Sequence, residues 1–415
     1  MKKLRARNGL IATLDVGSSK ICCFIARVED GAPRIIGIGH QVARGVRGGL
    51  INDIEAASQA ILGTVHAAEE MAGETVPEIV VNLSAGFAAS RIVKAEIALN
   101  GREATGTDIK RVLNQGYALR EPADRQVIHS IPVGFSIDGS RGIRDPRGMF
   151  GQRLGVNMNV VAANSGPVRN LAAAIGRCHL EVAALVVSPY AAGLSALVPD
   201  ETSLGVTVVD LGGGTTSIAV FFDQNMVFTD VVPVGGIHVT NDIARGLSTP
   251  VVHAERMKTL YGSAIASAAD EREMITVPQI GAEDETEPAQ IKKSLLVGII
   301  APRLEETFEL VRNSLEASGF DKIAGRRVVL TGGAAQLAGT RELAALILDK
   351  QVRIGRPAQV PGLAEATAGP AFACSAGLVQ FALSQSAEPL RQHGALAEEP
   401  NGLFGRVGVW IREHL

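Results

Sequence analysis

The sequence predicts an α/β protein built from two similar lobes that face each other across a cleft. Residues 11–20, IATLDVGSSK, are matched by residues 208–216, VVDLGGGTT. Each copy reads as an apolar strand, an Asp, a Gly-rich turn with hydroxyl side chains and a second apolar strand. In both halves a third strand, a Gly-containing loop and a helix follow in the same order, so we infer an internal duplication of about half the chain length.

The two Gly-rich turns have the chemistry of phosphate-binding loops. Glycine allows positive φ angles and lets backbone N–H groups approach a phosphate closely. Asp15 and Asp210 stand at the strand ends, where a carboxylate could hold hydrated Mg²⁺. One such turn alone fits an ordinary tight hairpin equally well. The repetition favours two loops that clamp the phosphates of a nucleotide, in the kind of inter-domain cleft where ligands bind.

Composition argues against several classes of protein. The 415 residues exceed a single hydrophobic core, and the net charge of −3 provides no basic surface, so we expect no nucleic-acid partner. The four cysteines lack metal-binding spacing, and adjacent Cys22 and Cys23 would point to opposite faces of one strand. We therefore expect reduced structural thiols in a cytosolic protein. No stretch reaches the length of a transmembrane helix, so we expect the body of the protein to be soluble.

The order of the motifs resembles that of the actin/Hsp70/sugar-kinase superfamily. Its two phosphate loops are similar to residues 15–20 and 210–216, and its adenosine loop is similar to residues 328–334, VVLTGGA. Its two connecting helices resemble residues 188–197 and 370–383. Within the superfamily, the chain from residue 10 to residue 383 resembles the FtsA family of bacterial cell-division proteins, through the segments IPVGFSID (131–138), DPRGMFGQRL (145–154), TNDIA (240–244) and HAERMK (253–258).

The resemblance implies an actin-like fold with an insertion in each lobe. After residue 84 the chain reads as strand 91–99, a helix after Thr107, strand 126–137 and strand 156–162, which suits a small α/β subdomain better than an elaborated loop. The expected first-lobe core is 8–84 and 164–203 with a returning helix at 369–383, and the inserted subdomain is 85–163. The expected second-lobe core is 204–234 and 301–368, with the second-lobe insertion at 235–300. A flexible linker at 384–401 and an amphipathic membrane-targeting helix at 402–415 would follow.

Two features of the second half leave alternatives open. Pro302 falls inside a long helical pattern, which predicts a kink or a boundary there. The acidic segment 280–288, IGAEDETEP, is expected to be a solvated loop rather than a metal site. The helical pattern itself rests on one apolar stripe, formed by Leu296, Ile300, Leu304, Phe308, Val311 and Leu315.

The resemblance also assigns roles to individual residues. Asp15 and Asp210 would lie beside Mg²⁺. ATP would contact both Gly-rich turns, the Gly-Gly loop that follows the second turn, and the adenosine loop. It would also contact Glu255 and Lys258, which lie on one helix face. Lys20 could instead point into solvent, and Glu255 with Lys258 could be an ordinary surface ion pair. The expected ATP-binding set is Gly17, Ser18, Ser19, Lys20, Gly212, Gly213, Gly214, Thr215, Gly235, Gly236, Glu255, Lys258, Gly332, Gly333 and Ala334.

Hydrolysis of ATP would need a polar side chain that orients a water molecule. Some members of the superfamily place a Glu before the Pro that starts the first connecting helix, and this chain has Ser188 there. A neutral hydroxyl is a poor base at pH 7. We therefore assign no catalytic residue and expect tight nucleotide binding with slow turnover at most.

Three functions compete at this stage. One is a membrane-tethered, actin-like scaffold of cell division similar to FtsA, and another is a kinase or phosphatase of the same superfamily. The last is a type IV pilus assembly ATP-binding protein with a similar inserted subdomain. An enzyme would need a carboxylate base near the phosphates, and neither alternative gives a role to the C-terminal tail. Segment 145–154 and the tail therefore favour the scaffold.

The resemblance implies a set of partners. They are further copies of the chain in an actin-like filament, later membrane proteins of the division machinery, and the C-terminal peptide of the tubulin-like protein FtsZ. The second-lobe insertion would bind this peptide, with Arg303 pairing with a peptide carboxylate, although a solvated helix Arg is nearly as plausible. The expected location is the cytoplasmic face of the inner membrane at the division site.

The C-terminal tail carries the expected membrane contact. On a helical wheel, one apolar face contains Leu403, Phe404, Val407, Trp410 and Ile411. The alternative is a helix docked on the protein's own surface. Because interfacial burial is partial, one tail should bind lipid weakly, whereas many tails linked in a filament should bind far more tightly.

Overall fold

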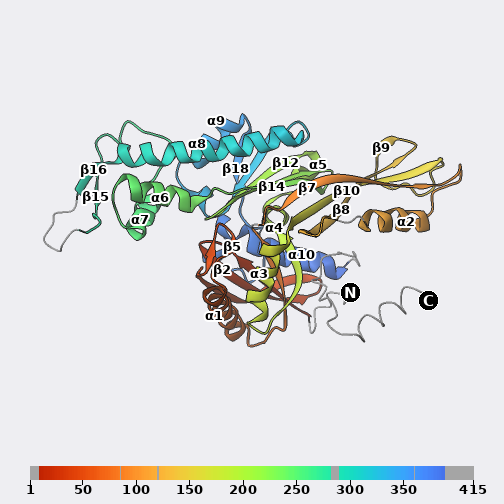
Figure 1. Ribbon diagram of the computed structural model, residues 1–415, viewed down its shortest axis with the longest axis horizontal. Coiled ribbons are helices and arrows are strands. Elements are labelled where there is room, and N and C mark those ends of the chain that lie inside the picture. The colour runs from red at the N-terminus through yellow and green to blue at the C-terminus, as the bar shows by residue number, and fades with distance from the viewer. Residues whose placement is uncertain (1–8, 85, 119–120, 282–288, 359, 388–415) are drawn as a thin grey trace.

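The computed structural model describes residues 9–84, 86–118, 121–281, 289–358 and 360–387. Figure 1 shows an elongated molecule with one lobe below the other. An inserted subdomain projects at one end, and the second-lobe insertion forms the opposite end. The expected two-lobed α/β fold with an insertion in each lobe is confirmed.

The first lobe contains a five-stranded sheet made of β1 (Leu10–Val16), β2 (Lys20–Glu29), β3 (Ala32–Val42), β6 (Glu78–Leu83) and β11 (Glu181–Val187). Its order is β3-β2-β1-β6-β11. The first three strands are antiparallel because short turns join them, whereas β6 and β11 add in parallel after crossover segments.

The second lobe repeats this sheet strand for strand. It consists of β12 (Val206–Leu211), β13 (Thr216–Phe222), β14 (Asn225–Val232), β17 (Arg327–Thr331) and β18 (Gln351–Ile354). The order is β14-β13-β12-β17-β18, again with three antiparallel strands followed by two parallel ones. β12 is therefore the equivalent of β1, and β17 is the equivalent of β6. The expected duplication is confirmed.

Helices cover the sheets and join the lobes. The first sheet packs against α1 (Ile54–Ala72) and α3 (Ser165–Gly176), and the second against α8 (Lys293–Ser318) and α9 (Thr340–Leu348). Between the sheets, α4 (Ser188–Ala196) and α10 (Ala373–Ala387) cross so closely that a Cβ on Gly377 would be 1.7 Å from the Ala191 carbonyl oxygen. The remaining short elements of the lobes are β4 (Val46–Arg47), β5 (Leu50–Ile51), α5 (Pro199–Leu204), η2 (Ala334–Gln336), η3 (Glu365–Thr367) and η4 (Pro370–Phe372).

The four cysteines are buried and free, as expected. On β2, Cys23 faces the core shared with α1, and Cys22 faces the core shared with α10, because successive strand residues point to opposite faces. Burial raises the pKa of Cys22 to about 12. A thiol with so high a pKa is unreactive at neutral pH, which fits a structural role.

The inserted subdomain is a four-stranded antiparallel sheet with one helix. Its elements are β7 (Ala89–Ala98), α2 (Gly106–Tyr117), β8 (Arg125–Ile137), β9 (Ser140–Ile143) and β10 (Arg153–Asn164), and its strand order is β7-β10-β8-β9. The sequence predicted all of these except the short β9. The helix begins after Thr105, whose hydroxyl caps it in a reciprocal pair of bonds with Asp108.

This subdomain covers one edge of each lobe's sheet with side-chain hydrogen bonds. On the first lobe, His129 of β8 accepts the Val187 N–H of edge strand β11 at 3.1 Å. On the second lobe, Ser90 Oγ accepts the Thr229 N–H of edge strand β14 at 2.8 Å, and Asn159 donates to a β14 carbonyl at 2.8 Å. Unpaired strand edges are thereby blocked in both lobes.

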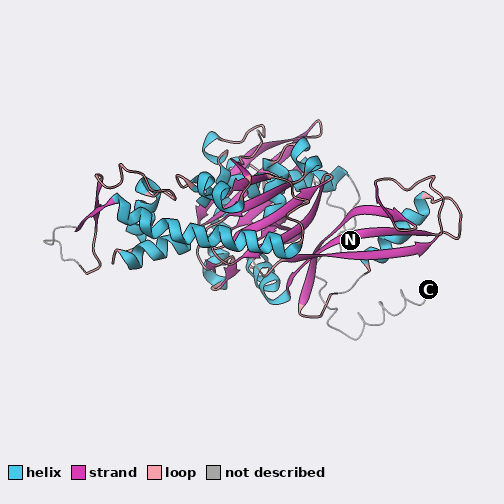
Figure 2. Cartoon of the chain, turned by 90° about the horizontal axis from the view of Figure 1, so that it is seen from above, coloured by secondary structure: helices cyan, strands magenta, loops and turns pink. Residues whose placement is uncertain are grey.

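The second-lobe insertion consists of α6 (Gly236–Gly246), α7 (Val251–Tyr261), β15 (Met274–Val277), β16 (Ala289–Lys292) and the start of α8. Figure 2 shows α8 as one long helix. It continues through Pro302 over 26 residues, so the alternative of a boundary at that residue is wrong, and all six residues of its apolar stripe are buried. The helix therefore also crosses the division placed between residues 300 and 301. Most of the acidic segment 280–288 lies outside the described residues.

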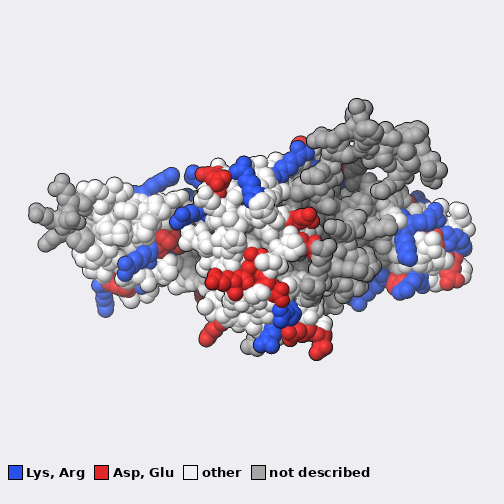
Figure 3. All heavy atoms as spheres, turned by 90° about the horizontal axis from the view of Figure 1, so that it is seen from below, with Lys and Arg blue, Asp and Glu red and all other residues white. Residues whose placement is uncertain are grey.

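The charged side chains on the described part of one face are mixed in sign. Figure 3 shows Lys and Arg interspersed with Asp and Glu rather than gathered into one basic surface. In the described part of the chain, no helix combines the length and hydrophobicity that a bilayer crossing requires. α10 extends to Ala387, beyond the expected end at 383, and residues 388–415, including the tail, lie outside the described residues.

Candidate functional site

The two Gly-rich turns have the same backbone geometry. Gly17 donates its N–H to the Lys20 carbonyl oxygen at 3.0 Å, and Gly212 donates to the Thr215 carbonyl oxygen at 2.9 Å. The strand register on either side is also equivalent, with Val16 opposite Ile21 and Leu211 opposite Thr216. The sequence repeat is therefore a structural repeat of one hairpin in each lobe.

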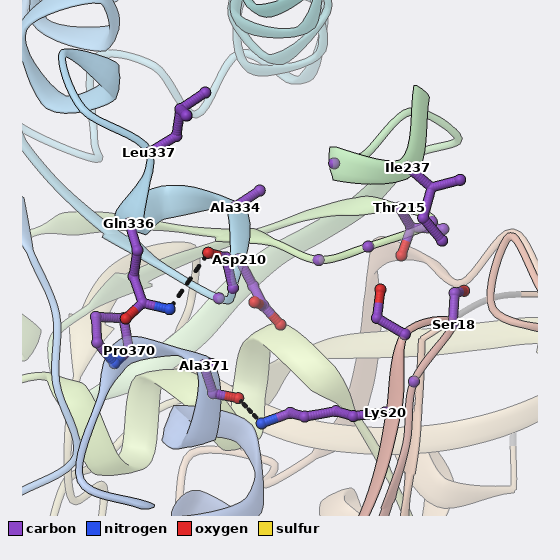
Figure 4. A pocket seen from close by; sticks show the side chains of 18 of the residues that line it. Ser18, Lys20, Asp210, Thr215, Ile237, Ala334, Gln336, Leu337, Pro370 and Ala371 are labelled. Carbon is purple, nitrogen blue, oxygen red and sulfur yellow. Dashed lines mark hydrogen bonds between the residues drawn. The ribbon is translucent and has the colours of Figure 1, made fainter. Parts of the chain in front are cut away.

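The two turns touch each other across the gap between the lobes. A Cβ on Gly213 would be 2.0 Å from Ser19 Oγ, and a Cβ on Gly214 would be 2.3 Å from Ser18 Oγ. Figure 4 shows Ser18 facing Thr215 across this contact. The serines of the first turn thus occupy the space that the glycines of the second turn leave open.

A cavity of about 590 Å³ extends from these turns between the lobes. This volume lies in the range typical of small-molecule sites. Every residue of the expected ATP and metal set lines it except Gly235. Gly235 supports the second turn from behind, since a Cβ there would be 2.7 Å from the carbonyl oxygens of Gly212 and Gly213. The sequence therefore predicted about half of the residues that line the cavity.

The carboxylates of Asp15 and Asp210 have different surroundings. Asp15 Oδ1 accepts the Asn82 amide at 2.8 Å and its Oδ2 accepts the Ser375 hydroxyl at 2.8 Å. Among the described residues, no hydrogen-bond donor contacts the Asp210 carboxylate. Burial raises the pKa of Asp15, and burial with the neighbouring Asp15 charge raises the pKa of Asp210 to about 7, while Lys20 opposes both shifts.

Lys20 lies at the floor of the cavity and does not point into solvent. Its ammonium donates to the Ala371 carbonyl oxygen and sits 3.3 Å from the centre of the Phe372 ring. Desolvation lowers its pKa, and the charge of Asp15 opposes that effect. The positive charge expected beside the phosphates is therefore present, held at the start of the helix that returns to the first lobe.

The N-terminus of α6 holds the second turn and meets the pair on α7. Gly236 and Ile237 donate their N–H groups to the carbonyl oxygens of Gly212 and Gly213 at 2.9 and 2.8 Å. Lys258 bonds to Glu255 at 2.7 Å, and also to the Thr240 hydroxyl at 2.8 Å and the Gly236 carbonyl at 3.1 Å. The pair is therefore part of the cavity wall as well as an ion pair.

The expected adenosine loop forms the opposite end of the cavity from Ser18. Gly332 has a φ of +87°, and a Cβ there would be 2.4 Å from the Leu211 carbonyl oxygen and 2.5 Å from Asp210 Oδ1. Only glycine fits both the left-handed backbone and the contact. Beyond it the lining is mixed, with Thr259, Leu260, Leu304, Gln336 and Leu337.

Sequence reasoning missed several polar lining residues. Asn82, Ser84, Ser188 and Cys374 line the cavity, and Ser375 bonds to Asp15 from behind it. One signal was available for Asn82, because it is a polar residue near the end of an otherwise apolar strand. Ser188 was noted only as a missing carboxylate. The acidic residues that line the cavity are Asp15, Asp210 and Glu255.

The donor atoms at the site suit magnesium. Carboxylate and hydroxyl oxygens are its preferred ligands, and Mg²⁺ usually keeps several waters. Within the described ranges, no three His, Cys, Asp or Glu side chains gather into a metal-binding cluster. Asp15 and Asp210 would therefore supply part of the coordination shell, with water and phosphate oxygens completing it.

Arg303 lies away from the cavity lining and is already paired. Its guanidinium donates to Asp242 of α6 at 2.5 Å and also to Glu306 on its own helix. The bidentate contact expected with a partner's carboxylate is thus occupied by Asp242 within the chain. The membrane residues Leu403 to Ile411 lie outside the described residues.

The fold is that of an actin-like protein, with two matching Gly-rich turns in an inter-lobe cleft. The chain resembles the solved PilM-PilN type IV pilus biogenesis complex (TM-score 0.64, 18% identity, 90% of this chain and 98% of that chain). It also resembles MreB 5 of Spiroplasma citri bound to AMPPNP (TM-score 0.51, 14% identity, 90% of this chain and 95% of that chain). At these identities the likeness shows the fold alone.

Sequence comparison identifies the family. The family model "Cell division protein FtsA" matches residues 207–377, and the "SHS2 domain inserted in FTSA" matches residues 88–162. Proteins described as cell division protein FtsA are 44% identical in Agrobacterium fabrum (98% of this chain, 95% of that protein), 35% in Pseudomonas aeruginosa (97% of each) and 30% in Escherichia coli (97% and 96%). The chain belongs to the FtsA family of cell-division proteins, which disfavours the kinase and pilus alternatives.

Proposed function

We propose that the chain binds ATP with Mg²⁺ in the inter-lobe cavity and serves as a membrane-tethered scaffold of cell division. The observation that carries the nucleotide site is the pair of matching turns, each with a carboxylate at its strand end. Backbone N–H groups and serine hydroxyls of the turns would contact the phosphates, and Lys20 would offset their charge. Asp15 and Asp210 would hold hydrated Mg²⁺, which when bound would supply positive charge beside the phosphates.

Turnover is proposed to be slow. Ser188 is buried, donates to Ser84 Oγ at 3.1 Å and accepts from Asn82 at 3.1 Å, so its hydroxyl is engaged within the protein. Phosphate release should stay well below the roughly 10 s⁻¹ typical of enzymes. A rate near that value would mean that another group in the cavity orients the water.

The scaffold role rests on family membership. The chain would tether FtsZ filaments to the cytoplasmic face of the inner membrane at the division site and help recruit later division proteins. Copies of the chain would associate head to tail into an actin-like filament, because a contact between two different surfaces that does not close into a ring can be repeated along a line. The tail would hold the filament on lipid, because many weak tails act together at high effective concentration.

Membrane binding can be tested separately from nucleotide binding. Liposome co-sedimentation of the intact chain with ATP should give a pellet, whereas Trp410→Glu and truncation after Pro400 should stay in the supernatant. Isothermal titration should find equal ATP affinity in all three proteins. Pelleting that survives both changes would place the membrane contact elsewhere and remove the tail from the proposal. Electron microscopy of the lipid-bound sample would test for filaments.

FtsZ binding through the second-lobe insertion is a further part of the proposal. Arg303 could take part only by exchanging its bond with Asp242 for one with the peptide. Fluorescence anisotropy with the FtsZ C-terminal peptide should show weaker binding by Arg303→Gln. Arg341→Gln is the control, since Arg341 also forms an ion pair on the second lobe but with Glu342 of α9. Equal affinity of Arg303→Gln and wild type removes Arg303 from the site.

A further inference from the structure

Asn82 is a buried amide in the cavity lining, and no sequence motif accounts for it. It stands near the end of β6 and is 1% exposed. Its Oδ1 accepts the Val16 N–H at 2.6 Å, and its Nδ2 donates to Asp15 Oδ1 at 2.8 Å. The side chain is thus fixed by the backbone of β1 just before the first turn, and in turn holds the carboxylate at that strand end.

The same Nδ2 group has more acceptors than protons. Besides Asp15, it lies 2.9 Å from Ser84 Oγ and 3.1 Å from Ser188 Oγ. A primary amide has two N–H groups, so three acceptors share two protons. Asn82 therefore joins the Asp15 carboxylate to both hydroxyls that line the cavity beside it.

Asp15 is held from a second side by Ser375 of α10. Each of its oxygens accepts one hydrogen bond from the protein, from β6 at one oxygen and from α10 at the other. Asp210 stands at the equivalent position of the second lobe, opposite Thr331 of β17. The Thr331 hydroxyl donates to the Pro370 carbonyl oxygen at 2.9 Å instead of to the carboxylate. The duplication has therefore produced one fixed and one unfixed carboxylate.

We propose that Asn82 is the positioning residue of the magnesium–nucleotide site, holding the Asp15 carboxylate in the orientation from which it binds the hydrated ion. The inference rests on the proposed ATP and Mg²⁺ function. Partners that orient a metal-binding side chain typically change metal affinity about 10–100-fold when they are removed. Asn82 acts through Asp15 and needs no contact with the nucleotide itself.

The test is a calorimetric titration of ATP into the intact chain, once with Mg²⁺ and once with a chelator. In wild type, Mg²⁺ should strengthen binding. In Asn82→Ala this strengthening should fall by about 10-fold or more, while affinity in chelator stays near that of wild type. Both variants remove the hydrogen bonds that the amide donates, but Asn82→Asp should lose more than Asn82→Ala because it also places a second negative charge against Asp15.

A matched control separates positioning from general loss of stability. Ser58→Ala likewise removes a buried hydrogen-bonding side chain from the first lobe, since the Ser58 hydroxyl bonds to the Ile54 carbonyl within α1 and to the Ala174 carbonyl of α3. It should lower the melting temperature and leave the magnesium effect unchanged. If Asn82→Ala does not fold, Ser375→Ala removes the other bond to Asp15 and should also weaken the magnesium effect.

The outcomes distinguish the two proposals. Wild type that binds no ATP overturns the proposed nucleotide site, and wild type that binds ATP equally with and without Mg²⁺ overturns the proposed magnesium role. Wild type with a magnesium effect that persists in folded Asn82→Ala overturns the role of Asn82 and leaves the nucleotide site in place. If only Ser375→Ala can be measured, a full magnesium effect in that variant overturns the positioning of Asp15 by its protein donors.

Discussion

The two lobes share a backbone and differ in the side chains that they bring to the cleft. Their turns have the same hydrogen bond and the same strand register, yet the first carries Ser18 and Ser19 where the second carries Gly213 and Gly214. The close contact explains the difference, because side chains on both turns could not fit into the 2.0–2.3 Å that a Cβ would leave. At these two positions the first turn supplies hydroxyl groups and the second supplies bare backbone.

The carboxylates at the strand ends differ in the same way. Asp15 is fixed by two donors, whereas Asp210 is backed by Gly332 and has a pKa raised to about 7 by burial and by Asp15. The two lobes thus place a carboxylate at equivalent positions, but the residues that contact the two carboxylates differ. The following experiments, from the largest expected effect to the smallest, test whether this asymmetry matters.

A side chain at position 332, next to Asp210, should destabilise the protein. Gly332→Ala places a Cβ at φ +87° and 2.4 Å from the Leu211 carbonyl oxygen, so we expect it to lower the free energy of unfolding by about 3 kcal/mol. Gly31→Ala is the control, since Gly31 has a φ of +80° with nothing within 4 Å of its Cβ position. It should lose only about 1 kcal/mol in urea denaturation. Equal losses would show that the space behind Asp210 can adjust.

The contacts of the inserted subdomain with the two sheet edges should differ in their response to pH. Burial lowers the pKa of His129, which caps the first-lobe edge, to about 3, from an ordinary value near 6.5. Between those values the unfolded chain binds a proton that the folded chain does not. The free energy of unfolding should therefore fall as the pH decreases, by about 3 kcal/mol at pH 4.5.

This pH effect needs a reference variant, because carboxylates also titrate in the same range. His129→Gln keeps an acceptor for the Val187 N–H and has no titration. Urea denaturation at pH 7 and pH 4.5 should show a larger loss for wild type than for His129→Gln. The Ser90 and Asn159 contacts on the second-lobe edge contain no titrating group, and parallel losses in both proteins would contradict the role of His129.

Removal of the unfixed carboxylate should weaken nucleotide binding. Asp210→Ala deletes one of the two expected metal-shell carboxylates, so affinity for ATP with Mg²⁺ should fall more than tenfold, which is above about 1.4 kcal/mol. Asp200→Ala, an exposed acid in the first turn of α5, should bind as wild type does. Unchanged affinity of Asp210→Ala in calorimetry would refute the metal assignment.

Because the two turns contact each other, substitutions of Gly213 and Ser19 should have non-additive effects on ATP affinity. Gly213→Ala directs a methyl group at Ser19 Oγ and should weaken ATP binding, whereas Ser19→Gly opens space for it. Direct neighbours typically couple by 0.5–3 kcal/mol, and we expect about 1 kcal/mol of rescue in the double variant. Additive effects in a double-mutant cycle on ATP affinity would mean that the turns do not meet in the nucleotide-binding state.

The sequence by itself determined the duplicated halves, the hairpin turns, the inserted subdomain and the Gly-rich and charged half of the cavity lining. Local sequence patterns predict each of these features, namely alternating apolar residues, a Gly-rich turn or an Asp at a strand end. Only the tertiary structure showed Asn82 and Ser375 on Asp15, because these pairs are 67 and 360 residues apart and meet only when the strands and α10 pack. It likewise decided the direction of Lys20 and the pairing of Arg303 with Asp242. A hydrogen bond between distant residues leaves no periodicity in the chain, so its partners are fixed by packing alone.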